Sequence, residues 1–170
     1  MDTYKINIEG LDRELRKFPV NDKLDIAAFI MFGDIEMTEV AARELLKRVP
    51  EHDVVVTAEA KGIPLCYEMA RQGCRNYVVA RKSVIGVTVN SITTKNEQKL
   101  YLGEDDVNLL NGKRVLLVDD VISTGESLHA LETLVEKTGA NIVGRASVLA
   151  EGDAKDRYDI IFLSELPLFF

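Results

Sequence analysis

Apolar and polar positions follow two different periods along residues 37–163, and these periods predict helices and strands in turn. Met37, Val40, Ala41 and Leu45 recur at helical spacing, and Thr38 is placed to cap the start of that helix. The same kind of apolar face marks residues 63–71 and 128–135, and a glycine follows each of these two segments. Three helices are therefore expected in this part of the chain.

Short apolar runs rich in β-branched residues lie between the helical segments. They cover residues 54–56, 77–80, 115–118, 142–149 and 160–163. Such runs are typical of strands that are buried on both faces of a parallel sheet. Strands that alternate with helices predict an α/β fold, in which a central parallel β-sheet is flanked by helices through right-handed crossovers. In sheets of this kind, ligands bind at the carboxyl ends of the strands.

Two regions depart from this alternation. Residues 1–35 carry one strand pattern at 4–8 and an apolar stretch at 27–32, and with residues 164–170 they are expected to form a small cap over the sheet. Residues 83–104 are polar, with weak alternation at 87–89 and 100–102, which predicts two strand arms of a flexible loop. A long excursion from a compact domain is usually functional or disordered. We expect one domain over residues 1–170.

Composition and charge exclude several classes of protein. The 170 residues are 46% apolar and 29% charged, as in ordinary globular domains, and the net charge is −7. An acidic surface repels a phosphate backbone, so no nucleic-acid partner is expected. No apolar run approaches the roughly 20 residues of a membrane helix, and the N-terminus has no signal-peptide core. A cytoplasmic protein without a membrane partner is predicted.

The cysteines and histidines do not form a convincing site. Cys66 and Cys74 are too few for a disulfide framework, and with His52 and His129 they lack metal-ligand spacing. We expect two small thiols that are buried or half-buried, and two histidines at the surface.

The chemistry concentrates where the strand 115–118 enters the segment 119–127. Asp119 and Asp120 end the strand, where their carboxylates can accept hydrogen bonds from paired hydroxyls or help to position a hydrated Mg²⁺. The small residues that follow open a helix, and their backbone N–H groups and hydroxyls can cradle an anion. Ser123, Thr124, Gly125, Glu126 and Ser127 form this second part.

Each part of this segment also has an ordinary structural interpretation. Two acids can simply end a strand, and Ser123 or Thr124 can simply cap a helix. The ordered succession of an apolar strand, two acids, two spacers, Ser-Thr-Gly and a helix favours a functional site that grips a sugar diol beside a phosphate.

This arrangement resembles the 5-phosphoribosyl-1-pyrophosphate (PRPP) motif of the type I phosphoribosyltransferases, and the resemblance covers residues 50–150. It implies that Asp119 and Asp120 hold the ribose 2′- and 3′-hydroxyls and contact Mg²⁺ indirectly. It also implies that residues 123–127 bind the 5′-phosphate, largely through backbone amides. Glu126 departs from the small residue common in the family, and its side chain is expected to point to solvent.

Two further segments fit the resemblance. Glu59, Ala60, Lys61 and Gly62 follow the strand 54–56 and are similar to the pyrophosphate loop of the adenine-type members, with lysine where arginine is common. Arg81 and Lys82 follow the strand 77–80 at the same end of the sheet, where the family places cations for pyrophosphate. By themselves, both segments would be interpreted as plain turns with surface cations.

The family also implies a lid, a metal ion and an assembly. Residues 83–104 match its flexible catalytic loop, from which Tyr101, Lys95 and Lys99 are candidates to touch pyrophosphate. Mg²⁺ bound with PRPP is the expected cofactor, and a homodimer is the expected assembly. The reaction displaces pyrophosphate from ribose C1 through an oxocarbenium-like transition state, so Arg81, Lys82, Asp119 and Asp120 are the predicted catalytic residues.

The base is the least constrained substrate. The pyrophosphate and lid segments favour a purine, with adenine first and a 6-oxopurine second. Phe18 or Phe32 could stack on it, and the tail 166–170 could add apolar walls. Two other functions stay open, namely a regulator that senses PRPP without catalysis and a phosphate-binding flavodoxin-like domain. The paired acids argue against the second, because a phosphate cradle has no use for two carboxylates.

Overall fold

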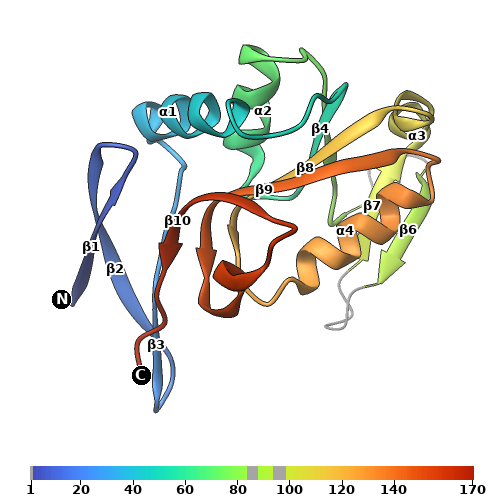
Figure 1. The fold of residues 1–170 in the computed structure, drawn as a ribbon. Coiled ribbons are helices and arrows are strands. Elements are labelled where there is room, and N and C mark those ends of the chain that lie inside the picture. The colour runs from blue at the N-terminus through green and yellow to red at the C-terminus, as the bar shows by residue number, and fades with distance from the viewer. Residues whose placement is uncertain (1, 84–87, 94–98) are drawn as a thin grey trace.

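A computed structural model describes residues 2–83, 88–93 and 99–170, with the backbone alone over 88–93 (Figure 1). Lys95, one of the lid candidates, lies outside the described residues. Among the helices that the structure describes, none has the length and apolar character needed to cross a membrane.

A five-stranded sheet forms the centre of the molecule, and all of its neighbouring pairs are parallel. The strand order is β10-β9-β8-β4-β5. The strands are β4 (Val54–Ala58), β5 (Tyr77–Ala80), β8 (Arg114–Ile122), β9 (Asn141–Glu151) and β10 (Ile161–Leu166). The predicted α/β class with a central parallel sheet is confirmed.

Helices cover both faces of this sheet, as Figure 1 shows. α1 (Ile35–Leu46) and α2 (Ile63–Gln72) pack on one face, and α4 (Glu126–Glu136) packs with α3 (Glu104–Leu110) on the other. Alternate residues of β8 supply the two cores, since Leu116 lies in the first and Leu117 in the second, both fully buried. Each such side chain stabilises the fold by about 1.5–3 kcal/mol, and this two-sided burial explains why the strand has an unbroken apolar run from Val115 to Val118.

The N-terminal strands form a separate antiparallel sheet that stands beside the central one (Figure 1). Its strands are β1 (Thr3–Ile8), β2 (Leu11–Asn21) and β3 (Leu24–Ala27). The C-terminal tail docks on this sheet, because Asp25 and Phe169 exchange backbone hydrogen bonds of 2.8 and 3.1 Å. The Phe169 ring also meets the Tyr4 ring edge-on at 5.2 Å between centroids. The two chain ends are thus held together.

The excursion after β5 contains the two predicted arms. β6 (Thr88–Thr93) and β7 (Lys99–Gly103) pair as an antiparallel ribbon. Tyr101 in β7 exchanges backbone hydrogen bonds of 2.8 and 2.9 Å with Arg81. This bridge fixes the returning arm against the end of β5.

Two local expectations need correction, and one helix was not foreseen. Asp34, rather than Thr38, caps α1, since its carboxylate accepts from the Met37 N–H at 3.1 Å, whereas Thr38 is inside the helix. β8 does not end at residue 118 but continues to Ile122, because its pairing with β9 continues. The seven-residue α3 is not expected from the sequence, since so short a helix leaves little apolar periodicity.

His52 is also not the surface residue that was expected. Its ring is partly buried, with Nδ1 2.8 Å from the Pro50 carbonyl oxygen, and the neighbouring Cys74 raises the pKa of its imidazole. The other three predictions of this group are confirmed. His129 is exposed, Cys66 is buried and Cys74 is half-buried.

Candidate functional site

The site begins where β4 and β8 stop pairing with each other. The register between β4 and β8 ends at Val56 and Leu117, whereas β8 stays paired with β9 through Ile122. Asp119 and Asp120 therefore lie on a stretch of β8 whose other edge faces the loop after β4. This divergence opens a cleft at the carboxyl edge of the sheet, where the topology predicts ligand binding.

The two carboxylates are tied to the backbone that carries them. Oδ1 of Asp119 accepts from the Asp120 N–H, and Oδ1 of Asp120 accepts from the Val121 N–H, each at 2.8 Å. Asp120 is buried, with 6% of its surface exposed. Burial raises the pKa of Asp119 well above its ordinary range, and the neighbouring Asp120 carboxylate adds to this shift. The pair is thus an electrostatically strained acceptor site that a donor-rich ligand would relieve.

The segment after the carboxylates wraps around a small cavity of about 120 Å³. Gly125 has a left-handed backbone, with φ of 83°, and α4 begins at the next residue. The predicted loop residues that line this cavity are Ser123, Thr124, Gly125 and Ser127. Glu126, the first residue of α4, is exposed. A turn of this shape at a helix N-terminus can hold a phosphate through backbone N–H groups.

A larger cavity of about 330 Å³ lies on the other side of Asp119. Its lining combines the loop after β4 with the carboxylates and the cation after β5. The predicted site residues in it are Glu59, Ala60, Lys61, Lys82, Asp119, Asp120 and Ser127. Asp119 and Ser127 line both cavities, so the two hollows are adjacent.

Gly62 lies in close contact with the carboxylate strand. A Cβ atom at this position would be 2.6 Å from Thr57 Oγ1 and 2.9 Å from Asp119 Oδ1. The loop after β4 can approach β8 this closely because residue 62 has no side chain. Ala60 follows a cis peptide bond from Glu59.

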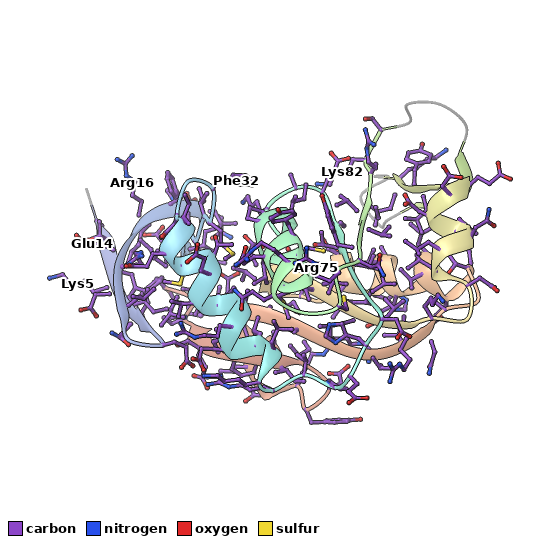
Figure 2. The ribbon with its side chains drawn as sticks, turned by 90° about the horizontal axis from the view of Figure 1, so that it is seen from above. Lys5, Glu14, Arg16, Phe32, Arg75 and Lys82 are labelled. Atoms are coloured by element: carbon purple, nitrogen blue, oxygen red, sulfur yellow. The ribbon has the colours of Figure 1, made fainter. Side chains whose placement is uncertain are left out.

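Arg81 and Lys82 are joined to the same loop through Glu59. The Glu59 carboxylate accepts from the Lys82 N–H at 3.3 Å and lies 3.5 Å from Arg81 Nε. Both basic side chains are exposed, and Figure 2 shows Lys82 along the same side of the molecule as Phe32. The predicted cations of the two strand ends are therefore brought to one place. Lys82 lines the larger cavity, whereas Arg81 reaches the site through Glu59 and Tyr101.

Several lining residues have no signal in the sequence. Leu100 of β7 closes one side of the larger cavity, and Val121, Ile122 and Leu128 line the smaller one. They are ordinary apolar residues, and only the fold shows that they face a cavity. Tyr101, the predicted lid contact, is partly buried next to Arg81.

One other hollow is a weaker candidate. A hollow of about 590 Å³ runs along the β1–β2 hairpin, but its lining is that of a ribbon with alternating charges. Within the described residues, no group of three or more histidine, cysteine or acidic side chains could hold a metal ion. The paired cavities at the carboxyl edge remain the best candidate.

Comparison with known proteins decides the family. The model of the phosphoribosyl transferase domain matches residues 31–165 of the chain. The chain belongs to the phosphoribosyl transferase family. As a member, it is an enzyme that transfers a pentosyl group.

Two relatives of this phosphoribosyl transferase are similar over most of their length. The hypoxanthine/guanine phosphoribosyltransferase of Methanococcus voltae is 33% identical over 86% of this chain and 83% of that protein. The adenine phosphoribosyltransferase of Rhodospirillum rubrum is 28% identical over 89% and 91%.

A solved structure shows the same fold. The adenine phosphoribosyltransferase from Thermoanaerobacter pseudethanolicus superposes with a TM-score of 0.72, covering 89% of this chain and 95% of that one, at 24% identity. The type I phosphoribosyltransferase fold expected from the sequence is confirmed.

Proposed function

We propose that this phosphoribosyl transferase moves the 5-phosphoribosyl group of PRPP to a purine base and releases pyrophosphate. The observation that carries the proposal is the pair of adjacent cavities that share Asp119 and Ser127. PRPP has a phosphate at each end of a ribose, and a site with two anion pockets separated by two carboxylates matches that order of groups.

The carboxylates are proposed to bind the ribose. A diol donates two hydrogen bonds, and acceptor oxygens are offered by Asp119, which lines both cavities, and by Asp120, which lines the larger one. Hydrogen bonds to a charged group contribute about 1.5–3 kcal/mol each. A ribose that donates to Asp119 would also stabilise the ionised form that burial disfavours.

The loop 123–127 is proposed to bind the 5′-phosphate. Its cavity of about 120 Å³ suits one phosphate group, and the left-handed Gly125 turns the backbone at the start of α4. The N–H groups of a first helical turn have no partner within the helix, so they can donate to the phosphate oxygens.

The pyrophosphate is proposed to lie in the larger cavity, against Lys61 and Lys82. Both are exposed cations at the rim of the cleft, where they can neutralise charge on the leaving group. Glu59 would repel pyrophosphate, so we assign it a different role, which is to hold Arg81 and the backbone of Lys82 in place. Tyr101 takes part by fixing the backbone of Arg81.

Catalysis in this site consists of positioning and electrostatic stabilisation. As the bond between ribose C1 and pyrophosphate breaks, positive charge grows on the sugar beside the carboxylates, and negative charge grows on pyrophosphate beside the cations.

The donor set fits a Mg²⁺ that arrives with PRPP. Asp119 and Asp120 reach the cleft, but among the described residues no cluster of three or more potential ligands could hold the ion without its substrate. When bound, Mg²⁺ supplies further neutralisation of the pyrophosphate charge.

The purine assignment draws on the relatives and on the sequence of the pyrophosphate loop. Adenine is the first candidate, from the likeness of residues 59–62 to the adenine-type members. A 6-oxopurine is the second, because the Methanococcus voltae relative at 33% identity is named for hypoxanthine and guanine. Phe32 is proposed to stack on the base, since this residue is 54% exposed on the side of the molecule where Lys82 lies (Figure 2).

The test is pyrophosphate release from PRPP and Mg²⁺ with adenine, hypoxanthine, guanine, xanthine, uracil and orotate offered one at a time. Turnover with adenine is expected, and turnover with hypoxanthine or guanine would select the second candidate. Turnover with a pyrimidine alone would contradict the purine assignment. Measurable PRPP binding without turnover of any base would favour a regulator that senses PRPP without catalysis.

Three features of the protein's setting remain part of the proposal. We infer a homodimer and a place in purine salvage from the family resemblance, and we keep the cytoplasmic location that was expected from the sequence. Sedimentation of the purified chain tests the dimer directly.

A further inference from the structure

Arg157 lies against the loop that is proposed to hold the 5′-phosphate. It follows η1 (Gly152–Asp156), the short helix between β9 and β10. A Cβ atom on Gly125 would be only 2.6 Å from Arg157 Nη1. The guanidinium therefore occupies the space that a side chain at position 125 would need.

Asp159 fixes the direction in which this guanidinium points. Its two carboxylate oxygens accept from Arg157 Nε at 2.9 Å and from Nη2 at 2.7 Å. A planar fork held at two of its nitrogens presents the third, Nη1, in a defined direction. That direction is toward Gly125.

The charge on Arg157 matters because of what the loop itself contains. The described lining of the 120 Å³ cavity has no lysine or arginine. The whole chain has a net charge of −7. A doubly charged phosphate would thus rely on backbone dipoles unless a cation lies nearby. The Arg157–Asp159 pair is close to neutral, but it is a dipole whose positive end faces the loop.

We propose that Arg157, oriented by Asp159, is a positioning residue for the 5′-phosphate loop, which it supports through Gly125 and makes electrostatically more favourable for a phosphate. The inference rests on the proposed function, since it assumes that the loop binds the 5′-phosphate. An ordinary half-exposed ion pair would have no effect on ligand binding.

The test compares two probes that occupy different parts of the site. Arg157→Met keeps much of the side-chain volume and removes the charge. We expect it to weaken binding of ribose 5-phosphate about tenfold and to leave binding of pyrophosphate with Mg²⁺ within about twofold. The difference in ribose 5-phosphate affinity between wild type and Arg157→Met should become smaller as the sodium chloride concentration is raised, because salt screens the electrostatic contribution. Calorimetric titration at low and high salt measures both.

Arg114→Met is the matched control. Arg114 makes the same two-nitrogen contact, with Asp53, at 2.9 and 3.2 Å, but at the start of β8 on the opposite edge of the sheet. It should change neither affinity. Equal ribose 5-phosphate binding by wild type and Arg157→Met would overturn the inference alone. A uniform loss for both probes with a lower Tm would also overturn it, since Arg157 would then be a general structural residue. If wild type does not bind ribose 5-phosphate, the proposed function fails as well.

Discussion

Asp119 combines a proposed binding role with an unfavourable environment, and one substitution can separate the two. Its pKa is raised in the folded protein by burial and by Asp120. The stability linked to this group is therefore present at low pH and is lost as the pH rises through the folded pKa. Asn at this position has no charge to bury.

We expect Asp119→Asn to raise the Tm at about pH 7–8 by roughly 2–4 °C, the shift that about 1 kcal/mol gives in a domain of this size. The gain should vanish in acid. PRPP binding should weaken at least about tenfold, because a charged hydrogen-bond acceptor is lost. Thermal unfolding between acid and neutral pH and PRPP titration measure the two effects. Retained PRPP affinity would remove the ribose assignment.

Lys61 tests the pyrophosphate assignment at the same scale. Lys61→Ala should weaken pyrophosphate binding about tenfold, because one charge-assisted contact is lost. Binding of a purine nucleoside monophosphate should change far less, since that ligand has no group in the place proposed for pyrophosphate. Lys113→Ala is the control, an exposed lysine just before β8. If both ligands weaken equally, Lys61 is structural.

At the scale of elements, the site depends on how closely the loop after β4 approaches β8. Gly62→Ala should destabilise the protein by about 1–3 kcal/mol and lower kcat/KM, because the new methyl group meets Thr57 and Asp119. Its φ of −82° suits alanine, so the effect is steric. Gly103→Ala is a close control, since Gly103 also precedes a helix, has φ of −73° and has no atom within 4 Å of the added group. The free energy of unfolding in urea should be clearly lower for Gly62→Ala than for Gly103→Ala.

The same elements show what could and could not be predicted from the sequence. β4 and β8 were predictable because strands buried on both faces consist of uninterrupted apolar residues. Asp119 and Asp120 were predictable because they follow such a run directly. The contact between Gly62 and Asp119 was not, since it joins two segments that are far apart in the sequence. The same holds for Arg157, which approaches Gly125 only after β9 and η1 have turned the chain back.

At the scale of the whole molecule, the C-terminal tail links the N-terminal sheet to the central one. Phe169→Ala should lower the Tm by a few degrees, because the Phe169 ring contacts Tyr4 and its centroid lies 4.0 Å from Lys17 Nζ. If the N-terminal sheet helps to hold the base, KM for the purine should rise while KM for PRPP stays constant. Phe170→Ala is the control, since this residue is 94% exposed. Equal Tm and KM values for the two variants would show that the Phe169 contacts affect neither stability nor base binding.

The middle position of β8 makes this strand more resistant to local unfolding than the N-terminal sheet. β8 has a partner strand on each side and a packed core on each face, so local opening there is expected to be as rare as unfolding of the whole protein. The N-terminal sheet is smaller and has exposed apolar side chains such as Phe18 and Val20. If the N-terminal sheet holds the base, as proposed, warming should therefore weaken base binding at temperatures where the ribose and its phosphates are still bound. Selectivity for the base would then be lost at a lower temperature than affinity for PRPP.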